Sequence, residues 1–170
     1  MLTPMNTQDH PSSDIQTIDA QIISFFQDGV KILGLPKSVG EIYGLLYASP
    51  KPLTMLDLIN QLGISKGSAS QGLKMLRTLG AVREVQHNND RKAYFEADIE
   101  LKKLVGGFIR EEIRPHLNSG QEKLQRLEQE LDNLSSAELR EFYEARIKRL
   151  KRWAGKANLV LPMLQKLLGE

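Results

Sequence analysis

Apolar residues recur at spacings of three and four along most of the chain, the pattern of amphipathic helices. Residues 14–34 form the first such segment, which Gly34 and Pro36 end, and we expect it to be an N-terminal dimerisation helix. A short second helix is expected from Ser38, which precedes Glu41 in a capping-box pattern. Residues 1–13 are polar and are expected to be disordered. The pattern predicts a mainly α fold.

Two further helices follow, separated by a three-residue turn. Thr54 and Asp57 repeat the capping pattern before the first of them, and Gly63 supplies the turn. The second is expected over residues 66–79, with Ser65 as its cap and Gly80 as its C-terminal stop. Two helices joined by a short glycine-containing turn are typical of a helix-turn-helix motif.

After Gly80 the helical periodicity gives way to strand-forming residues. Residues 81–86 and 93–97 contain valine, tyrosine and phenylalanine, and turn formers separate them at positions 87–90. This predicts a small β-hairpin, the wing of a winged helix-turn-helix. The DNA-binding domain is therefore expected to cover residues 35–98.

Residues 99–170 are expected to be a helical dimerisation region. Asp98 is expected to cap its first helix, which Pro115 and the run from Asn118 to Gly120 should interrupt. Ser135 and Glu138 form a further capping pattern, and a last short helix is expected over 159–168. Four leucines at alternating three- and four-residue steps favour a coiled-coil seam and a helical bundle equally: Leu124, Leu127, Leu131 and Leu134.

Composition removes several classes of function. The chain has no cysteine and only three isolated histidines, so we expect no disulfide, thiol chemistry or metal site. Glycine-rich phosphate loops, paired carboxylates and nucleophile–base pairs are not recognisable, so we expect neither an enzyme nor a cofactor. The polar start does not resemble a signal peptide and no apolar run could cross a membrane, so a cytoplasmic protein without membrane contact is expected.

Positive charge is concentrated in residues 66–92, which contain six basic and two acidic residues although the whole chain carries only +2. On the helix predicted for residues 66–79, small hydrogen-bonding and basic residues lie opposite an apolar stripe. Gln71 is suited to reading adenine, and the cations to contacting phosphate. The alternatives are a solvated amphipathic helix and, at the hairpin tip, simple turn chemistry. The candidate DNA-binding residues are Lys66, Gly67, Ser68, Ser70, Gln71, Lys74, Arg77, Asn89, Asp90, Arg91 and Lys92.

Several segments together resemble the GbsR-like branch of the MarR-type transcriptional regulators. They are LPKSVGEIYGLLY from Leu35, LGISKGSASQGL from Leu62, LGAVR from Leu79 and DRKAYF from Asp90. The resemblance covers roughly residues 35–113. It implies a homodimer that presents two winged helices to a palindromic site, and repression relieved or altered by a small molecule. The MarR wing carries Asp-x-Arg, whereas here Asp90 and Arg91 are adjacent, which leaves the wing contact open.

Two aromatic residues are candidates for contact with a small-molecule effector. Tyr43 and Tyr47 lie one helical turn apart, a spacing that core residues share. A second basic run, from Arg146 to Lys156, contains six basic residues and no acidic one. It is open to three interpretations: a solvated helix face, phosphate contacts or contact with an acidic partner.

The function predicted from these features is sequence-specific binding of double-stranded DNA in transcriptional regulation, with a repressor favoured. A structural or plasmid-partition-type winged-helix adaptor is the alternative, since one fold serves several functions. Genomic position separates the two, because a partition adaptor is encoded beside a filament-forming NTPase. A winged helix that binds only protein is disfavoured by the basic helix and wing.

Overall fold

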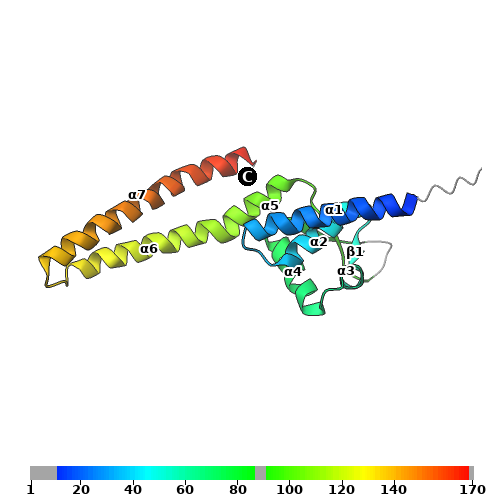
Figure 1. The fold of residues 1–170 in the computed structure, drawn as a ribbon, viewed down its shortest axis with the longest axis horizontal. Helices are drawn as coiled ribbons and strands as arrows, with labels where there is room; N and C mark the ends of the chain where they lie inside the picture. Colours follow the sequence, from blue (N-terminus) through cyan, green and yellow to red (C-terminus); the bar gives the residue numbers. More distant parts are fainter. Residues whose placement is uncertain (1–10, 87–90, 169–170) are drawn as a thin grey trace, which may run out of the picture. The chain divides into compact units, whose positions relative to one another are not determined.

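The computed structural model describes residues 11–86 and 91–168. It divides into two compact units, one ending at Ile99 and the other beginning at Glu100, which are described separately. The first contains helices α1 (Pro11–Ile32), α2 (Lys37–Ala48), α3 (Met55–Leu62) and α4 (Lys66–Thr78) and strands β1 (Leu53–Thr54), β2 (Val82–Val85) and β3 (Tyr94–Ala97). The second contains α5 (Leu101–Phe108), a π-helical turn η1 (Ile109–Ile113), α6 (Arg114–Leu131) and α7 (Ala137–Leu167) (Figure 1). The mainly α fold with a winged helix-turn-helix is confirmed.

The wing is an antiparallel hairpin of β2 and β3, as the sequence predicts. Val82 pairs with Ala97 and Val85 with Tyr94. A third strand, β1, adds to the other edge of β3 and gives the sheet order β1-β3-β2. The sequence pattern does not predict β1, because two residues are too short to show an alternation.

Helix α2 lies at the centre of the core of the first unit and is covered by α1 and α4. Phe26 of α1 and Tyr43 of α2 meet edge to face, with ring centroids 4.7 Å apart. Gly40 makes this close packing possible, because a Cβ there would lie 2.6 Å from the main-chain oxygen of Phe26. The segment expected to be a separate dimerisation helix is therefore packed against the helix-turn-helix, within the same unit. It also begins at Pro11 rather than Asp14, within the segment expected to be disordered.

The capping predictions in the first unit have different outcomes. Thr54 and Asp57 form a complete capping box at α3, and Ser65 accepts a hydrogen bond from the N–H of Ser68 at α4, as predicted. Gly63 and Gly80 have φ of 65° and 73°, the left-handed backbone expected where these helices end. The prediction at Ser38 is wrong. Here α2 begins one residue earlier, Pro36 is the N-cap and no side chain caps the helix.

Helix boundaries in the second unit differ from the predictions at four places. Asp98 does not cap α5, whose N-cap is Glu100 without a side-chain hydrogen bond. The predicted break over residues 115–120 does not occur. The chain stays helical through α5, the π-helical turn η1 and α6, which follow one another without a gap. In that turn the N–H of Arg114 donates to the carbonyl of Ile109, five residues back, and the widened turn lies just before Pro115, which has no N–H to donate.

The last predicted helix is part of a longer one. Residues 159–168 do not begin a separate helix, because α7 runs without interruption from Ala137 to Leu167 and contains Pro162. Its cap is Ser136 rather than Ser135, and the hydroxyl of Ser136 accepts from the N–H of Leu139. The helix thus starts one residue later than the sequence pattern suggests.

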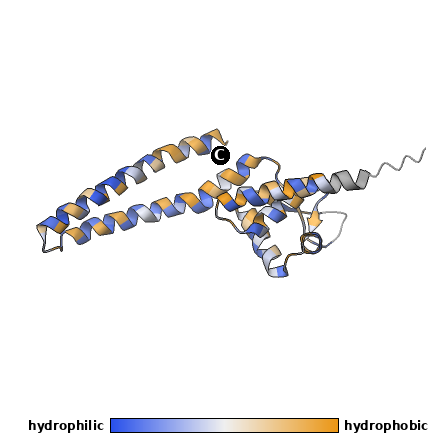
Figure 2. Cartoon of the chain, in the orientation of Figure 1, coloured by the Kyte–Doolittle hydropathy of each residue, from blue (hydrophilic) through white to orange (hydrophobic). Residues whose placement is uncertain are grey.

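Helices α6 and α7 pack against each other within the chain. Ile147 and Ala154 are buried on α7, and Gln165 accepts a hydrogen bond from Arg114. Lys151 of α7 pairs with Glu128 of α6 at 2.6 Å. Hydrophobic and hydrophilic residues alternate along both helices (Figure 2). Much apolar surface of α7 remains uncovered by the rest of the described chain.

Candidate nucleic-acid interface

Helix α4 is held in the first unit by its apolar side. Ala69, Leu73 and Leu76 are buried, as the sequence pattern predicts. Gly72 is buried beside them, and a Cβ at this position would lie 2.5 Å from Cδ1 of Ile42. Close packing against α2 therefore fixes which side of α4 faces outward.

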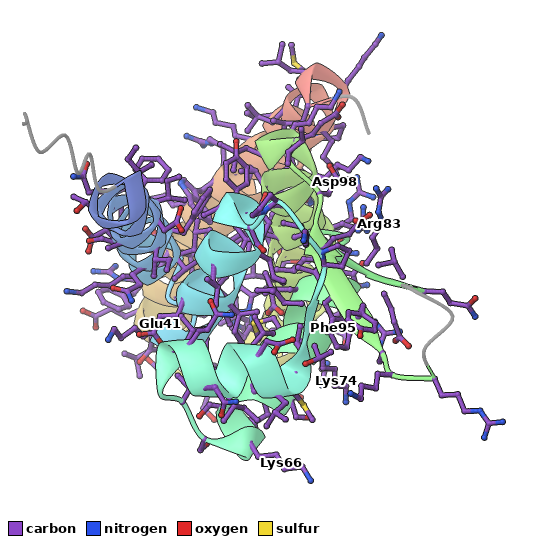
Figure 3. All side chains as sticks on the ribbon, turned by 90° about the vertical axis from the view of Figure 1, so that its right-hand side faces the viewer. Glu41, Lys66, Lys74, Arg83, Phe95 and Asp98 are labelled. Carbon is purple, nitrogen blue, oxygen red and sulfur yellow. The ribbon has the colours of Figure 1, made fainter. Side chains whose placement is uncertain are left out.

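The outward side of α4 carries most of the predicted DNA-binding residues. Six are exposed, and besides Arg77 they are Lys66, Gly67, Ser70, Gln71 and Lys74. Neither lysine has an ion-pair partner among the described residues. Lys66 extends outward at the start of the helix (Figure 3). The structure thus brings together a hydrogen-bonding amide, a hydroxyl, a glycine and two exposed cations on one helical face.

Ser68 differs from the other predicted residues of this helix. Its side chain is half-buried, and its hydroxyl lies 3.0 Å from that of Ser65. Its N–H donates to the same Ser65 oxygen at 3.1 Å. Ser68 is therefore part of the N-terminal cap of α4, a local role that the sequence pattern does not separate from DNA contact.

Arg77 is exposed but is not a free cation. Its Nη1 lies 3.1 Å from Oε2 of Glu84 on β2, and both side chains are about half exposed. The pair joins the last turn of α4 to the wing. The sequence pattern does not reveal this partner, because the seven-residue separation crosses a turn and carries no periodic signal.

A groove of about 500 Å³ lies between α4 and the sheet. Its polar wall is formed by α4, from Ser70, Lys74, Arg77 and Thr78. Phe95 of β3 lies across from them, near Lys74 (Figure 3). Along this edge Lys74 and the hydroxyl groups suit an extended anion such as a nucleic-acid backbone, whereas Arg77 is already paired with Glu84.

The described part of the wing ends in positive charge. Arg91 and Lys92 are exposed, while Asn89 and Asp90 lie outside the described residues. The side chain and backbone N–H of Thr54 lower the pKa of Asp57, and the charge of Lys92 lowers it further. Lys92 therefore acts electrostatically on the beginning of α3, the first helix of the helix-turn-helix.

The two predicted effector contacts occupy different environments. Tyr43 is fully buried, and its hydroxyl donates to the carbonyl oxygen of Asp98 at 2.6 Å. Burial raises the pKa of this hydroxyl well above its usual range. Tyr47 is half-buried and lines a hollow of about 290 Å³ together with Arg83, Glu96 and other residues. Only Tyr47 is placed to meet a bound molecule.

Neither a metal cluster nor a membrane span is found in the described part of the chain. Within residues 11–86 and 91–168, no three histidine, aspartate or glutamate side chains gather as a metal site would require. None of the helices described there is long and apolar enough to cross a membrane.

No family model matches the chain. Among curated proteins it is similar to the HTH-type transcriptional repressor GbsR of Bacillus subtilis (strain 168), with 30% identity over 88 residues, which are 52% of this chain and 48% of that protein. The HTH-type transcriptional repressor OpcR of the same organism is 24% identical over 84 residues, 49% of this chain and 45% of that protein. The matched region thus spans about half the length of the curated relatives.

A solved structure described as a transcriptional regulator shares the fold. It matches with a TM-score of 0.63 and 19% identity, and covers 92% of this chain and 96% of the other. The curated relatives confirm the resemblance to GbsR-like, MarR-type helix-turn-helix regulators that the sequence motifs indicate, and the solved structure confirms the fold.

Proposed function

We propose that this chain is a sequence-specific DNA-binding transcriptional regulator that acts as a homodimer on a palindromic operator. A repressor is the form we favour, in keeping with the names of the curated relatives, and we propose that a small molecule controls it. The observation that carries the proposal is the outward face of α4. There Gln71 and Ser70 lie beside Lys66 and Lys74, two cations with no ion-pair partner in residues 11–86 and 91–168.

The side chains of this face suit the major groove. An α-helix fits this groove, where a glutamine amide pairs with both the N6 and N7 atoms of adenine. Exposed Gly67 and Ser70 keep the first turns of α4 small, so that the backbone can approach closely. We propose that Gln71 reads a base, with Ser70 and Gly67 beside it.

We assign the phosphate contacts to the exposed cations of α4 and the wing. Lys66 and Lys74 lie on α4, and Arg91 and Lys92 lie at the described end of the wing. Asn89 and Asp90 remain proposed wing-tip contacts on sequence grounds alone. Ser68 contributes by capping α4, and Arg77 reaches phosphate only if it leaves Glu84.

Dimerisation is proposed from the apolar surface left uncovered. Trp153, Met163 and Leu167 of α7 are 67%, 70% and 82% exposed, and Phe25 of α1 is 66% exposed. Large apolar side chains exposed in this way, on α7 and separately on α1, are typical of interfaces in soluble proteins. A two-fold dimer would present two copies of α4 to the half-sites of a palindrome.

An effector site is proposed in the hollow beside Tyr47. The hollow combines the ring of Tyr47 with the side chains of Ser49 and Lys51 and would take a small polar molecule. Because strands β2 and β3 of the wing also border this hollow, a ligand there would act directly on a proposed DNA-contacting element. We therefore place any binding of an effector in the hollow beside Tyr47.

Selection from a random pool of duplex DNA tests the proposal. We expect enrichment of one palindromic sequence, bound with an affinity that falls steeply as salt rises. Salt-dependent binding without enrichment would favour the structural adaptor instead. Failure to retain any duplex at low salt would contradict a DNA-binding function.

A further inference from the structure

Glu84 is an acidic residue on β2, beside the basic residues of α4 and the wing. In the β2–β3 pairing it stands directly opposite Phe95, so both side chains project from the same face of the sheet. Phe95 is buried and lines the groove beside α4. Glu84 therefore lies on the side of the wing that faces α4, where its carboxylate reaches Arg77 at 3.1 Å.

Arg77 is the cation on which this carboxylate acts. It lies one turn beyond Lys74 and borders the same groove. Lys66 and Lys74 have no ion-pair partner among the described residues, whereas the charge of Arg77 is opposed by Glu84. Among the described residues, the positive edge of the groove is thus neutralised at Arg77, where α4 meets the wing.

We propose that Glu84 keeps Arg77 from DNA phosphates and so limits how tightly the protein holds DNA of any sequence. The inference rests on the proposed function. Affinity for random DNA comes from cations that neutralise phosphates and release counterions. A phosphate approaching Arg77 must displace the Glu84 carboxylate and then remain close to its negative charge, so this cation adds little to binding while the pair persists.

Glu96 provides a matched control on the same hairpin. It stands directly opposite Arg83 in the register and forms an ion pair with it. Since side chains alternate along a strand, this pair lies on the other face of the wing from Glu84. Glu84→Gln and Glu96→Gln remove the same charge from the same element, but only the first releases Arg77. Exposed ion pairs contribute little to stability, so both variants should fold.

The test measures the affinity of the full chain for a random-sequence duplex over a series of salt concentrations. We expect Glu84→Gln to bind about 3- to 10-fold more tightly, with a salt dependence steeper by roughly one unit per subunit. Glu96→Gln should change the affinity less than about twofold, since it frees no cation near α4. Arg77→Gln alone should have little effect, and Arg77→Gln combined with Glu84→Gln should remove the gain.

Two results would overturn this inference while leaving the proposed function intact. One is an equal gain in Glu84→Gln and Glu96→Gln, which would show a general effect of charge. The other is a large loss in Arg77→Gln alone, which would show that Arg77 already contacts phosphate. Absence of salt-dependent DNA binding by the unchanged protein would instead overturn the proposed function, and the inference with it.

Discussion

The hydroxyl of Tyr43 donates a hydrogen bond to the main-chain carbonyl of Asp98, with 2.6 Å between the two oxygen atoms. The N–H of Asp98 in turn donates to the carbonyl of Ala81 at 2.8 Å. A fully buried side chain of α2 thus ties down the segment that follows the wing. This makes Tyr43 a structural residue, and the effector proposal rests on Tyr47 alone.

Replacing Tyr43 by phenylalanine should lower the free energy of unfolding by about 1 kcal/mol, since the change removes one buried hydrogen bond and keeps the ring. Tyr47→Phe is the control, because the structure gives the Tyr47 hydroxyl no hydrogen bond among the described residues. Urea denaturation of both variants measures the difference. Equal stability of the two would show that the Asp98 bond contributes nothing.

Gly40→Ala should destabilise the fold by about 2–3 kcal/mol, because the new Cβ would meet the main-chain oxygen of Phe26 at 2.6 Å and force α1 away from α2. Gly29 on α1 has nothing within 4 Å of its Cβ position, so Gly29→Ala should stabilise the protein by up to about 1 kcal/mol. Thermal unfolding compares them. A stable Gly40→Ala protein would contradict the packing of α1 on α2.

Asp57→Asn should lower stability by about 0.5–2 kcal/mol at neutral pH, because the charged capping box is removed. Hydrogen bonds from Thr54 hold the folded pKa of Asp57 below its ordinary value of 3.8. The carboxylate therefore stabilises the fold fully above that ordinary value, and the contribution disappears as pH falls through the folded pKa. Denaturation of both proteins over a pH series should show their difference shrinking in acid. A difference that is independent of pH would exclude a role for the charge.

Gln71→Ala should cost about 1–3 kcal/mol of affinity on the selected operator and little on random DNA, because it removes a hydrogen-bonded pairing with a base. Lys74→Ala should weaken both duplexes alike and make the salt dependence shallower by roughly one unit per subunit, because each subunit then neutralises one phosphate fewer. Arg91→Ala should cost most where the flanking minor groove is narrow. Titrations at several salt concentrations separate these patterns. Equal weakening of both duplexes by Gln71→Ala would rule out base reading by this face.

Met163→Glu on the uncovered face of α7 should convert the proposed dimer to monomer, because the new charge would be buried between two copies. Gln121→Glu, at an exposed position of α6, is the control and should leave the dimer intact. Sedimentation at micromolar concentration reports the assembly state. A monomeric unchanged protein would refute the dimer, and a dimeric Met163→Glu protein would place the interface elsewhere.

The sequence alone predicts those features of the fold that depend on interactions between residues close together in the chain. The caps at Thr54 and Ser65 and the glycine stops at Gly63 and Gly80 follow from the sequence, because each depends on residues within one helical turn. The apolar stripe of α4 is predictable for the same reason. Local patterns at Ser38, Asp98 and Ser135 failed, since the same residue types also occur one or two positions from a helix start.

Tertiary structure decided what depends on distant partners. Neither Pro115 nor Pro162 ends a helix in the structure. Pro115 follows a π-helical turn, and Pro162 lies inside α7. The Glu84–Arg77 pair exists only because the hairpin register turns Glu84 toward α4, and Tyr43 is buried only because Gly40 lets α1 approach. Composition and periodicity placed the positive charge on one helix and the wing. Which of those charges remain free to meet a phosphate is set by register and packing, which join residues that no local spacing relates.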